Sequence, residues 1–216
     1  MAGEMAQTLQ MAGNLILNEE SADRNGLSLT LLIERARTGD CAAFDQIMIC
    51  YQRKVVSTAW RMLGNEEDAR DAAQEAFLRV YRYLNKYDER QEFAGWLYRI
   101  VVNVCRDIAR KRGRNQGFAS IDTERESGEL DALQSSDDVE AAAILSQEKA
   151  IIANALDTLS NKEREAIVLR DLEGLSTEEV AQILGSSQTT VRSQISSARA
   201  KIKQYRDRVL NRRRQR

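Results

Sequence analysis

The 216-residue sequence contains no proline and no histidine. Proline interrupts helices and marks loops, so its absence favours a chain that is almost entirely helical. The lack of histidine removes the commonest general base and the commonest metal ligand, which argues against an enzyme. No apolar run approaches the ~18 residues that a membrane span requires, so we expect neither a membrane span nor a signal peptide.

Cysteine is also scarce, since only Cys41, Cys50 and Cys105 are present. The number is odd and no two of them stand at metal-ligand spacing, so neither a disulfide framework nor a zinc site is indicated. We therefore expect reduced thiols in a cytoplasmic protein, with no cofactor, no metal, no small-molecule substrate and no catalytic residue.

Charge of each sign is distributed unevenly, although the net charge is only −1. Residues 1–27 carry a net −3, residues 28–112 a net +3, residues 113–142 a net −6 and residues 143–216 a net +5. The segment from Gln188 to Arg216 holds ten Lys and Arg against one acid, Asp207. A basic segment on a helical module is an electrostatic footprint for nucleic acid, although a solvated surface helix would show the same bias.

The pattern predicts two small helical domains joined by a flexible acidic linker. We expect an N-terminal extension at 1–27, a first module at 28–112, a linker at 113–138, a second module at 139–210 and a basic tail at 211–216. Apolar residues at three-and-four spacing predict four helices in each module. The expected helices are Leu29–Thr38, Cys41–Leu63, Asn65–Leu84, Phe93–Arg112, Val139–Thr158, one opened by Ser160, one from Ser176 to Leu184, and one starting at Gln188.

The last two of these helices form a helix-turn-helix pattern. Ser160 and Ser176 each stand three residues before a glutamate, which is the signature of a capping box at a helix start. Gly185 then supplies the turn before the basic helix. In this arrangement the start of the second helix enters the major groove of DNA, whereas a plain helical hairpin would not. The outward face of that helix carries Gln188, Thr189, Thr190, Arg192, Ser193, Ser196, Arg199 and Lys203.

A second basic face lies on the helix predicted over Phe93–Arg112. Arg99, Asn103, Arg106 and Arg110 share one side of it, opposite the apolar seam. The preceding loop, Lys86–Glu92, offers Lys86, Tyr87, Asp88 and Arg90. Cations beside aromatic rings suit single-stranded bases, since rings stack on bases and cations meet phosphates. Phe93 and Trp96 are interpreted as core residues.

Together these segments resemble a bacterial extracytoplasmic-function (ECF) sigma factor, group IV of the sigma-70 superfamily, over residues 28–206. The first module resembles region 2 and the second region 4, with region 3 absent. The family's Asp-x-x-Gln-x-x-Phe signature stands at Asp71, Gln74 and Phe77. The end of region 2 is matched by Phe93, Trp96, Asn103, Asp107 and Arg110, and region 4 by Leu159 through Ile202.

The resemblance implies a role for each face. Residues Asp68, Asp71, Gln74, Phe77 and Arg79 would bind the clamp helices of the largest subunit of core RNA polymerase. The loop Lys86–Glu92 and the Arg99–Arg110 face would melt and read the −10 element of promoter DNA, and the Gln188–Lys203 face the −35 element. The flap of the second-largest polymerase subunit and an anti-sigma factor are further expected partners, as is a role in a stress or signal response.

Three other functions remain open at this point. Residues Leu159–Lys203 also resemble the output domain of LuxR-type regulators, which bind DNA without polymerase, but 28–112 lacks the alternating strands and helices of their sensor domains. An enzyme is disfavoured because Glu66, Glu67 and Asp68 are adjacent rather than a facing pair, and no Gly-rich phosphate loop is present. A helical scaffold that binds no nucleic acid would show no salt-dependent association with DNA.

Overall fold

The computed structural model describes residues 29–116 and 150–214. Every regular element in these two ranges is helical, which confirms the all-α fold with two small domains. The first module is residues 29–116 and the second is residues 150–214. The expected N-terminal extension at 1–27, positions 117–138 of the expected linker and positions 139–149 of the expected second module lie outside the described residues. No helix in the described ranges is long and apolar enough to cross a membrane.

Capping residues set both ends of α3 and the start of α4 in the first module. The side chain of Asp40 accepts a hydrogen bond from the backbone N–H of Ala43, and that of Asn65 from Asp68. Gly64 ends a helix with φ of 78°, a backbone conformation that glycine adopts without strain. The elements are α2 (Leu29–Arg37), α3 (Cys41–Leu63), α4 (Glu66–Tyr83), the 3-10 turn η2 (Leu84–Lys86) and α5 (Phe93–Gln116).

The core of the first module is built from the apolar faces of these helices. The small residues Ala69, Ala72 and Ala76 are fully buried on α4 and let α3 and α5 approach it closely. Phe44 and Ile47 on α3 and Leu97, Val101 and Val104 on α5 complete the packing. The apolar spacing of α3, α4 and α5 predicts these packed faces, with one exception: Tyr81 was expected on the inner stripe of α4 but is 51% exposed.

Two helices run further than the sequence predicted. Helix α5 continues through Gly113 to Gln116, although the first module was expected to end at Arg112. A glycine inside a helix costs only about 1 kcal/mol relative to alanine, so Gly113 alone is too weak a breaker to end the helix. Helix α9 (Gln188–Arg214) likewise takes in most of the expected basic tail.

The second module is a helix-turn-helix supported by two shorter helices. Residues 150–157 form its first helix, followed by α7 (Asn161–Ile167), the π-helical turn η3 (Val168–Leu172), α8 (Thr177–Leu184) and α9. Both predicted capping boxes are present, Ser160 with Glu163 and Ser176 with Glu179. Gly185 ends α8 with φ of 65°. The π turn was not predicted, because nothing in the local sequence marks it.

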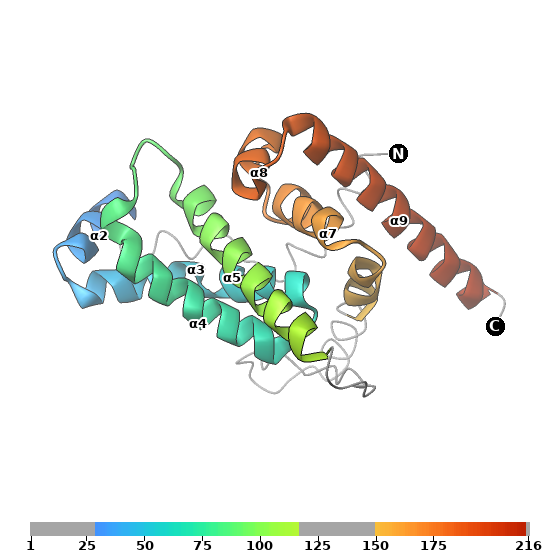
Figure 1. Cartoon of the computed structure of the whole chain (residues 1–216), viewed down its shortest axis with the longest axis horizontal. Helices are drawn as coiled ribbons and strands as arrows, with labels where there is room; N and C mark the ends of the chain where they lie inside the picture. Colours follow the sequence, from blue (N-terminus) through green and yellow to red (C-terminus); the bar gives the residue numbers. More distant parts are fainter. Residues whose placement is uncertain (1–28, 117–149, 215–216) are drawn as a thin grey trace.

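Helix α5 lies at the centre of the molecule (Figure 1), with α3 and α4 on one side and α8 of the second module on another. Its residues Leu97 and Val101 belong to the core of the first module. Tyr98 and Val102, one position further along the chain, are instead buried with Leu169, Val180 and Val191 of the second module. The two modules therefore share a packed interface, and α5 contributes to both cores.

Helix α9 is held on α7 by one buried carboxylate. Glu163 accepts hydrogen bonds from Lys201 Nζ at 2.7 Å and from the Ser197 hydroxyl at 2.5 Å, besides its capping bond from the Ser160 N–H at 2.8 Å. Its side chain is only 10% exposed. Hydrogen bonds from Lys201 and Ser197 lower the pKa of Glu163 to about 2. Glu179, which occupies the same position in the other capping box, has an exposed capping bond to Ser176.

Comparison of these two glutamates tests the anchoring of α9. Glu163→Gln should lower the free energy of unfolding by about 1–2 kcal/mol at neutral pH, because a charge-assisted contact to α9 is lost. Glu179→Gln should cost less than about 0.5 kcal/mol, since the exposed cap keeps an acceptor. Urea unfolding followed by circular dichroism measures both.

The pH dependence of the Glu163 effect has a defined sign. Because its folded pKa of about 2 lies below the ordinary 4.5, the carboxylate stabilises the fold fully above pH 4.5, and this contribution is lost as the pH falls toward 2. The stability difference between wild type and Glu163→Gln should therefore shrink across that window. Equal costs for the two variants, or a difference that does not change with pH, would contradict the anchoring role.

Candidate nucleic-acid interface

The start of α9 presents a polar surface on a rigid base. Val191, Ile195 and Ala198 face inward and are buried, so the intervening positions point outward. Ser187 caps the helix, because its hydroxyl accepts a hydrogen bond from the Thr190 N–H at 3.1 Å. The eight residues expected to face the −35 element are all exposed: Gln188, Thr189, Thr190, Arg192, Ser193, Ser196, Arg199 and Lys203.

Contacts within this surface set how its side chains are presented. Arg192 donates to the amide oxygen of Gln188, one turn earlier, at 3.2 Å. Arg199 is joined by two hydrogen bonds, of 2.8 and 2.7 Å, to the carboxylate of Asp171 in η3, and this contact raises the pKa of Arg199. Arg192 is thus the exposed cation nearest the tip of the hairpin, whereas Arg199 shares its charge with an acid of the same module.

The basic face of α5 is only partly open. Arg99, Asn103 and Arg110 are exposed, as their spacing predicts. Arg106 is instead half-buried, and its Nε and Nη2 donate to the two carboxylate oxygens of Glu165 on α7 at 2.9 and 2.7 Å. This paired geometry raises the pKa of Arg106 and occupies the same donors that a phosphate would take.

The segment between α4 and α5 is tied down by the first module itself. Arg37 of α2 donates hydrogen bonds to the backbone oxygens of Leu84 and Tyr87 and to the carboxylate of Glu89. Tyr87 is only 7% exposed, and its ring packs against the rings of Phe93 and Trp96 of α5. In this conformation the Tyr87 ring belongs to the core and offers no face for stacking.

The other residues expected to contact the −10 element from this segment remain at the surface. Lys86 lies over the ring of Tyr83, with its Nζ 5.2 Å from the ring centre. Arg90 is exposed and pairs with Asp88 at 2.6 Å, and the hydrogen bonds from Arg90 lower the pKa of Asp88 to about 2. The exposed part of the loop is therefore charged rather than aromatic. As expected, Phe93 is buried and Trp96 partly so.

The outer face of α4 carries the residues expected to contact polymerase. Asp71 and Gln74 are exposed, and Asp68 pairs with Arg112 of α5 at 3.2 Å. Arg79 pairs with Glu75 at 2.7 Å and with Asp107 at 3.3 Å. Phe77 is different, since it is 8% exposed and packs in the first core. Its ring thus supports α4 from inside and is not part of the outer face.

Sequence reasoning missed the residue that joins the two modules. Glu173, directly after the π turn, has a side chain only 3% exposed. Its Oε1 accepts from the Thr58 hydroxyl at 2.6 Å and from Arg61 Nη1 at 3.0 Å, and its Oε2 accepts from the Tyr98 hydroxyl at 2.6 Å. Burial and the neighbouring carboxylate raise the pKa of the Tyr98 phenol far above its ordinary value, so the phenol stays a proton donor. We refer to these four residues as the Glu173 contact.

One signal in the sequence points toward this interface. Tyr98 and Val102 stand four residues apart and lie beside the main seam of α5, so they give the helix a second apolar stripe. A helix with two apolar stripes packs against two neighbours. This signal does not identify Glu173, the acid that accepts from Tyr98. Glu173 lies just after the π turn, and only folding brings it to α3 and α5.

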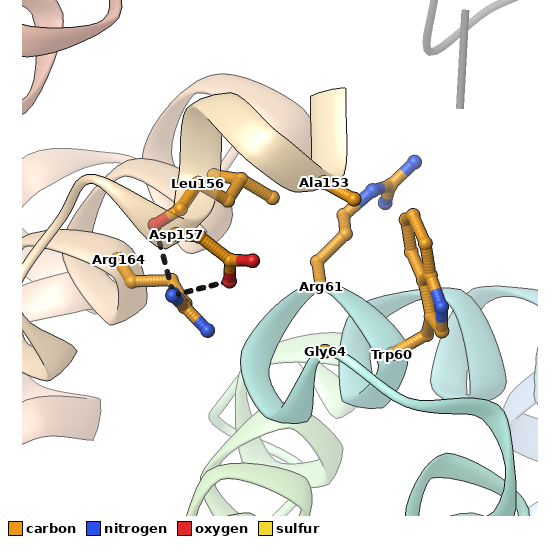
Figure 2. Close-up of a pocket in the computed structure, with 7 residues that line it drawn as sticks. All are labelled: Trp60, Arg61, Gly64, Ala153, Leu156, Asp157 and Arg164. Atoms are coloured by element: carbon orange, nitrogen blue, oxygen red, sulfur yellow. Dashed lines mark hydrogen bonds and ion pairs between the residues drawn. The ribbon is translucent and has the colours of Figure 1, made fainter. Parts of the chain in front are cut away.

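A shallow pocket marks the edge of the same interface (Figure 2). Trp60, Arg61 and Gly64 line it from the first module, and Ala153, Leu156, Asp157 and Arg164 from the second. Arg164 donates to the Leu156 carbonyl at 3.2 Å and to Asp157 at 3.0 Å. Within the described residues no cluster of side chains suits a metal ion.

Each of the two modules matches a known protein family. The family model for Sigma-70 region 2 matches residues 47–115, and that for Sigma-70, region 4 matches residues 149–202. The RNA polymerase sigma-H factor of Pseudomonas aeruginosa is 35% identical over 173 residues, covering 79% of this chain and 90% of that protein. The ECF RNA polymerase sigma-E factor of Escherichia coli K12 is 36% identical over 174 residues, covering 80% of this chain and 91% of that protein.

A solved structure has a similar fold. It contains the sigma factor RpoE in complex with the anti-sigma factor NepR from Bartonella quintana, and it matches 76% of this chain and 96% of that one with a TM-score of 0.62 at 23% identity. The LuxR-type alternative is not favoured, because the first module is matched by the region 2 model rather than by a sensor domain. The chain therefore belongs to the ECF family of RNA polymerase sigma factors, which initiate transcription and are not enzymes.

Proposed function

We propose that this sigma factor directs core RNA polymerase to a specific set of promoters, with residues 29–116 acting as region 2 and residues 150–214 as region 4. The observation that carries the proposal is the uniformly exposed polar face at the start of α9, held on a buried apolar stripe. That face fits the major groove of duplex DNA, where Arg and Gln side chains recognise guanine and adenine. It is therefore assigned to the −35 element.

The first module is assigned to the −10 element and to polymerase. The −10 contacts are Lys86, Asp88 and Arg90 of the loop and Arg99, Asn103, Arg106 and Arg110 of α5, whose cations suit a single strand. Tyr87 stabilises the loop from within. The exposed acids and amide of α4 are assigned to the clamp helices of the largest polymerase subunit, and the second module to the flap of the second-largest subunit.

The cellular setting follows from the family. A protein that works on RNA polymerase and promoter DNA acts in the cytoplasm, and we assign this chain there. We also propose that an anti-sigma factor holds it inactive until a stress or other signal releases it. In support, the structurally similar RpoE is itself bound to an anti-sigma factor.

Run-off transcription tests promoter recognition. Core polymerase with the wild-type chain should give promoter-specific transcripts from a library of promoters, and Arg192→Ala should reduce them because a base contact worth about 1–3 kcal/mol is lost. Arg208→Ala removes the same charge from an exposed position further along α9 and is the matched control. Unchanged transcription by Arg192→Ala at every promoter would overturn the assignment of the recognition face.

Polymerase binding is tested separately on α4. Gln74→Ala should weaken binding to core polymerase about tenfold, as expected for an exposed interface residue, without changing thermal stability. Gln52→Ala, on the exposed side of α3, is the control and should bind as wild type. Affinity is measured by fluorescence anisotropy of labelled sigma factor.

Phe77→Ala should behave differently from Gln74→Ala. Because its ring is buried, the loss should appear first as about 3–5 kcal/mol of stability in a melting experiment. Normal polymerase binding by a folded Gln74→Ala protein would contradict the assignment of this face of α4.

A further inference from the structure

Arg37 of α2 reaches the segment that joins α4 to α5. The end of α4 and this segment lie beside α2 (Figure 1). All three nitrogens of the Arg37 guanidinium donate hydrogen bonds there. Its Nε donates to the Leu84 carbonyl at 3.2 Å and its Nη2 to the Tyr87 carbonyl, while its Nη1 donates to the carboxylate of Glu89. One side chain of α2 therefore fixes the backbone at two points and a side chain at a third, 47 to 52 residues further along the chain.

The Tyr87 side chain completes this arrangement. The guanidinium carbon of Arg37 lies 5.7 Å from the centre of the Tyr87 ring, and the ring packs against Phe93 and Trp96. The Tyr87 hydroxyl donates to the Gln91 carbonyl at 2.5 Å. Arg37 thus holds the first part of the segment and Tyr87 the second, and both are fixed to the core of the first module.

The residues of this segment that are assigned to the −10 element alternate with the fixed points. Lys86 precedes Tyr87, Asp88 stands between Tyr87 and Glu89, and Arg90 follows Glu89. Lys86 and Arg90 are exposed and Asp88 is half-buried. Because their backbone is held on either side, these side chains leave the loop in set directions. A loop already held in its binding conformation loses less entropy on binding, so its contacts contribute more to affinity.

The environment of Arg37 does not suit a direct contact with DNA. Its side chain is only 23% exposed, and each of its nitrogens already has an acceptor. Arg35, two residues earlier on α2, differs in both respects, since it is 44% exposed and pairs with Asp40 at 2.6 Å. The two arginines carry the same charge on the same helix, but only Arg37 is bonded to the segment between α4 and α5. Arg35 is therefore the matched control.

We propose that Arg37 is a positioning residue for −10 recognition, which holds the segment from 84 to 91 in the backbone conformation that reads the bases and does not touch the DNA itself. This inference rests on the proposed function, because it requires Lys86, Asp88 and Arg90 to contact the −10 element. Loss of Arg37 leaves these three side chains in the chain but frees their backbone. Discrimination between −10 sequences then falls, whereas reading of the −35 element and binding of polymerase persist.

The conformation of the segment is measured in the free chain. Trp96 packs against Tyr87, with ring centres 5.2 Å apart, and Trp60 is the one other tryptophan in the sequence. In a Trp60→Phe background the fluorescence therefore reports on Trp96 alone. Arg37→Ala should raise acrylamide quenching of Trp96 about twofold, because Tyr87 is no longer held, and Arg35→Ala should leave it unchanged. Quenching equal to wild type in Arg37→Ala would overturn the positioning role.

Promoter discrimination is measured with core polymerase and the full chain. A promoter that the wild type transcribes is compared with copies that carry one changed base in the −10 or in the −35 element. Each change should lower run-off transcription by wild type about tenfold. In Arg37→Ala the −10 change should cost less than about threefold and the −35 change still about tenfold, whereas Arg35→Ala should keep both costs. A fold defect alone would lower transcription from every template and leave these ratios unchanged, which would overturn the proposal.

Arg37→Lys keeps the test decisive if Arg37→Ala does not fold. Lysine preserves the charge, but its one nitrogen cannot meet two carbonyls and a carboxylate in the geometry of a guanidinium. The −10 discrimination of Arg37→Lys should therefore lie below that of wild type. Full −10 discrimination in a folded Arg37→Lys protein would show that charge alone matters and would overturn the proposal.

Lys86→Ala and Arg90→Ala separate this inference from the proposed function. Both should lower −10 discrimination, because these side chains are themselves assigned to the DNA. If neither does, the segment does not read the −10 element, and that assignment falls together with this inference. If either does while Arg37→Ala discriminates like wild type, the −10 assignment stands and only the positioning role of Arg37 is overturned.

Discussion

The buried carboxylate of Glu173 determines how the two halves of this chain sit together. It satisfies three donors from two different helices of the first module, and the apolar residues around it exclude water. Taking an ion pair out of water costs roughly what the attraction between the charges returns. The pair therefore adds little net stability, but it specifies geometry, because a shifted contact between the same two surfaces would leave Arg61 or Glu173 buried without its partner.

Helix α5 shows what this geometry means for function. One side of the helix completes the core of the first module through Leu97 and Val101. The adjacent side carries Tyr98 and Val102, which are buried against residues of the second module. Its exposed side carries Arg99 and Arg110, two of the cations assigned to DNA. A single helix thus serves folding, interdomain packing and nucleic-acid binding. A movement of the second module would therefore change the contacts of the residues on α5 that are assigned to DNA, such as the pair between Arg106 and Glu165.

Local sequence signals predicted most of the fold. Asn65, Ser160 and Ser176 begin helices, and Gly64 and Gly185 end them, because these residues satisfy the exposed backbone groups at helix ends. The outward face of α9 was also predicted correctly as exposed, since a regular helix turns 100° per residue and its apolar stripe defines the opposite side.

The remaining features depend on contacts between residues distant in sequence. Tyr87 was expected at the −10 surface but is buried, because an aromatic ring in a loop between polar neighbours gives no local sign of which way it faces. Phe77 lies on the inner apolar stripe of α4, and its burial agrees with that periodicity. Glu173 follows the π turn at Val168–Leu172 and finds its partners on α3 and α5, far away in sequence. No pattern within the second module alone could have predicted them.

The central claim concerns the placement of the modules in the free chain, and energy transfer between two dyes measures it most directly. Dyes on cysteines introduced at the exposed positions Gln52 and Gln204, with Cys41, Cys50 and Cys105 replaced, report the separation of α3 and α9. The account predicts high transfer in the free chain and a clear fall in a folded Glu173→Gln protein, which loses the charge that joins the modules. Low transfer in the free chain, or transfer in Glu173→Gln equal to wild type, would contradict it.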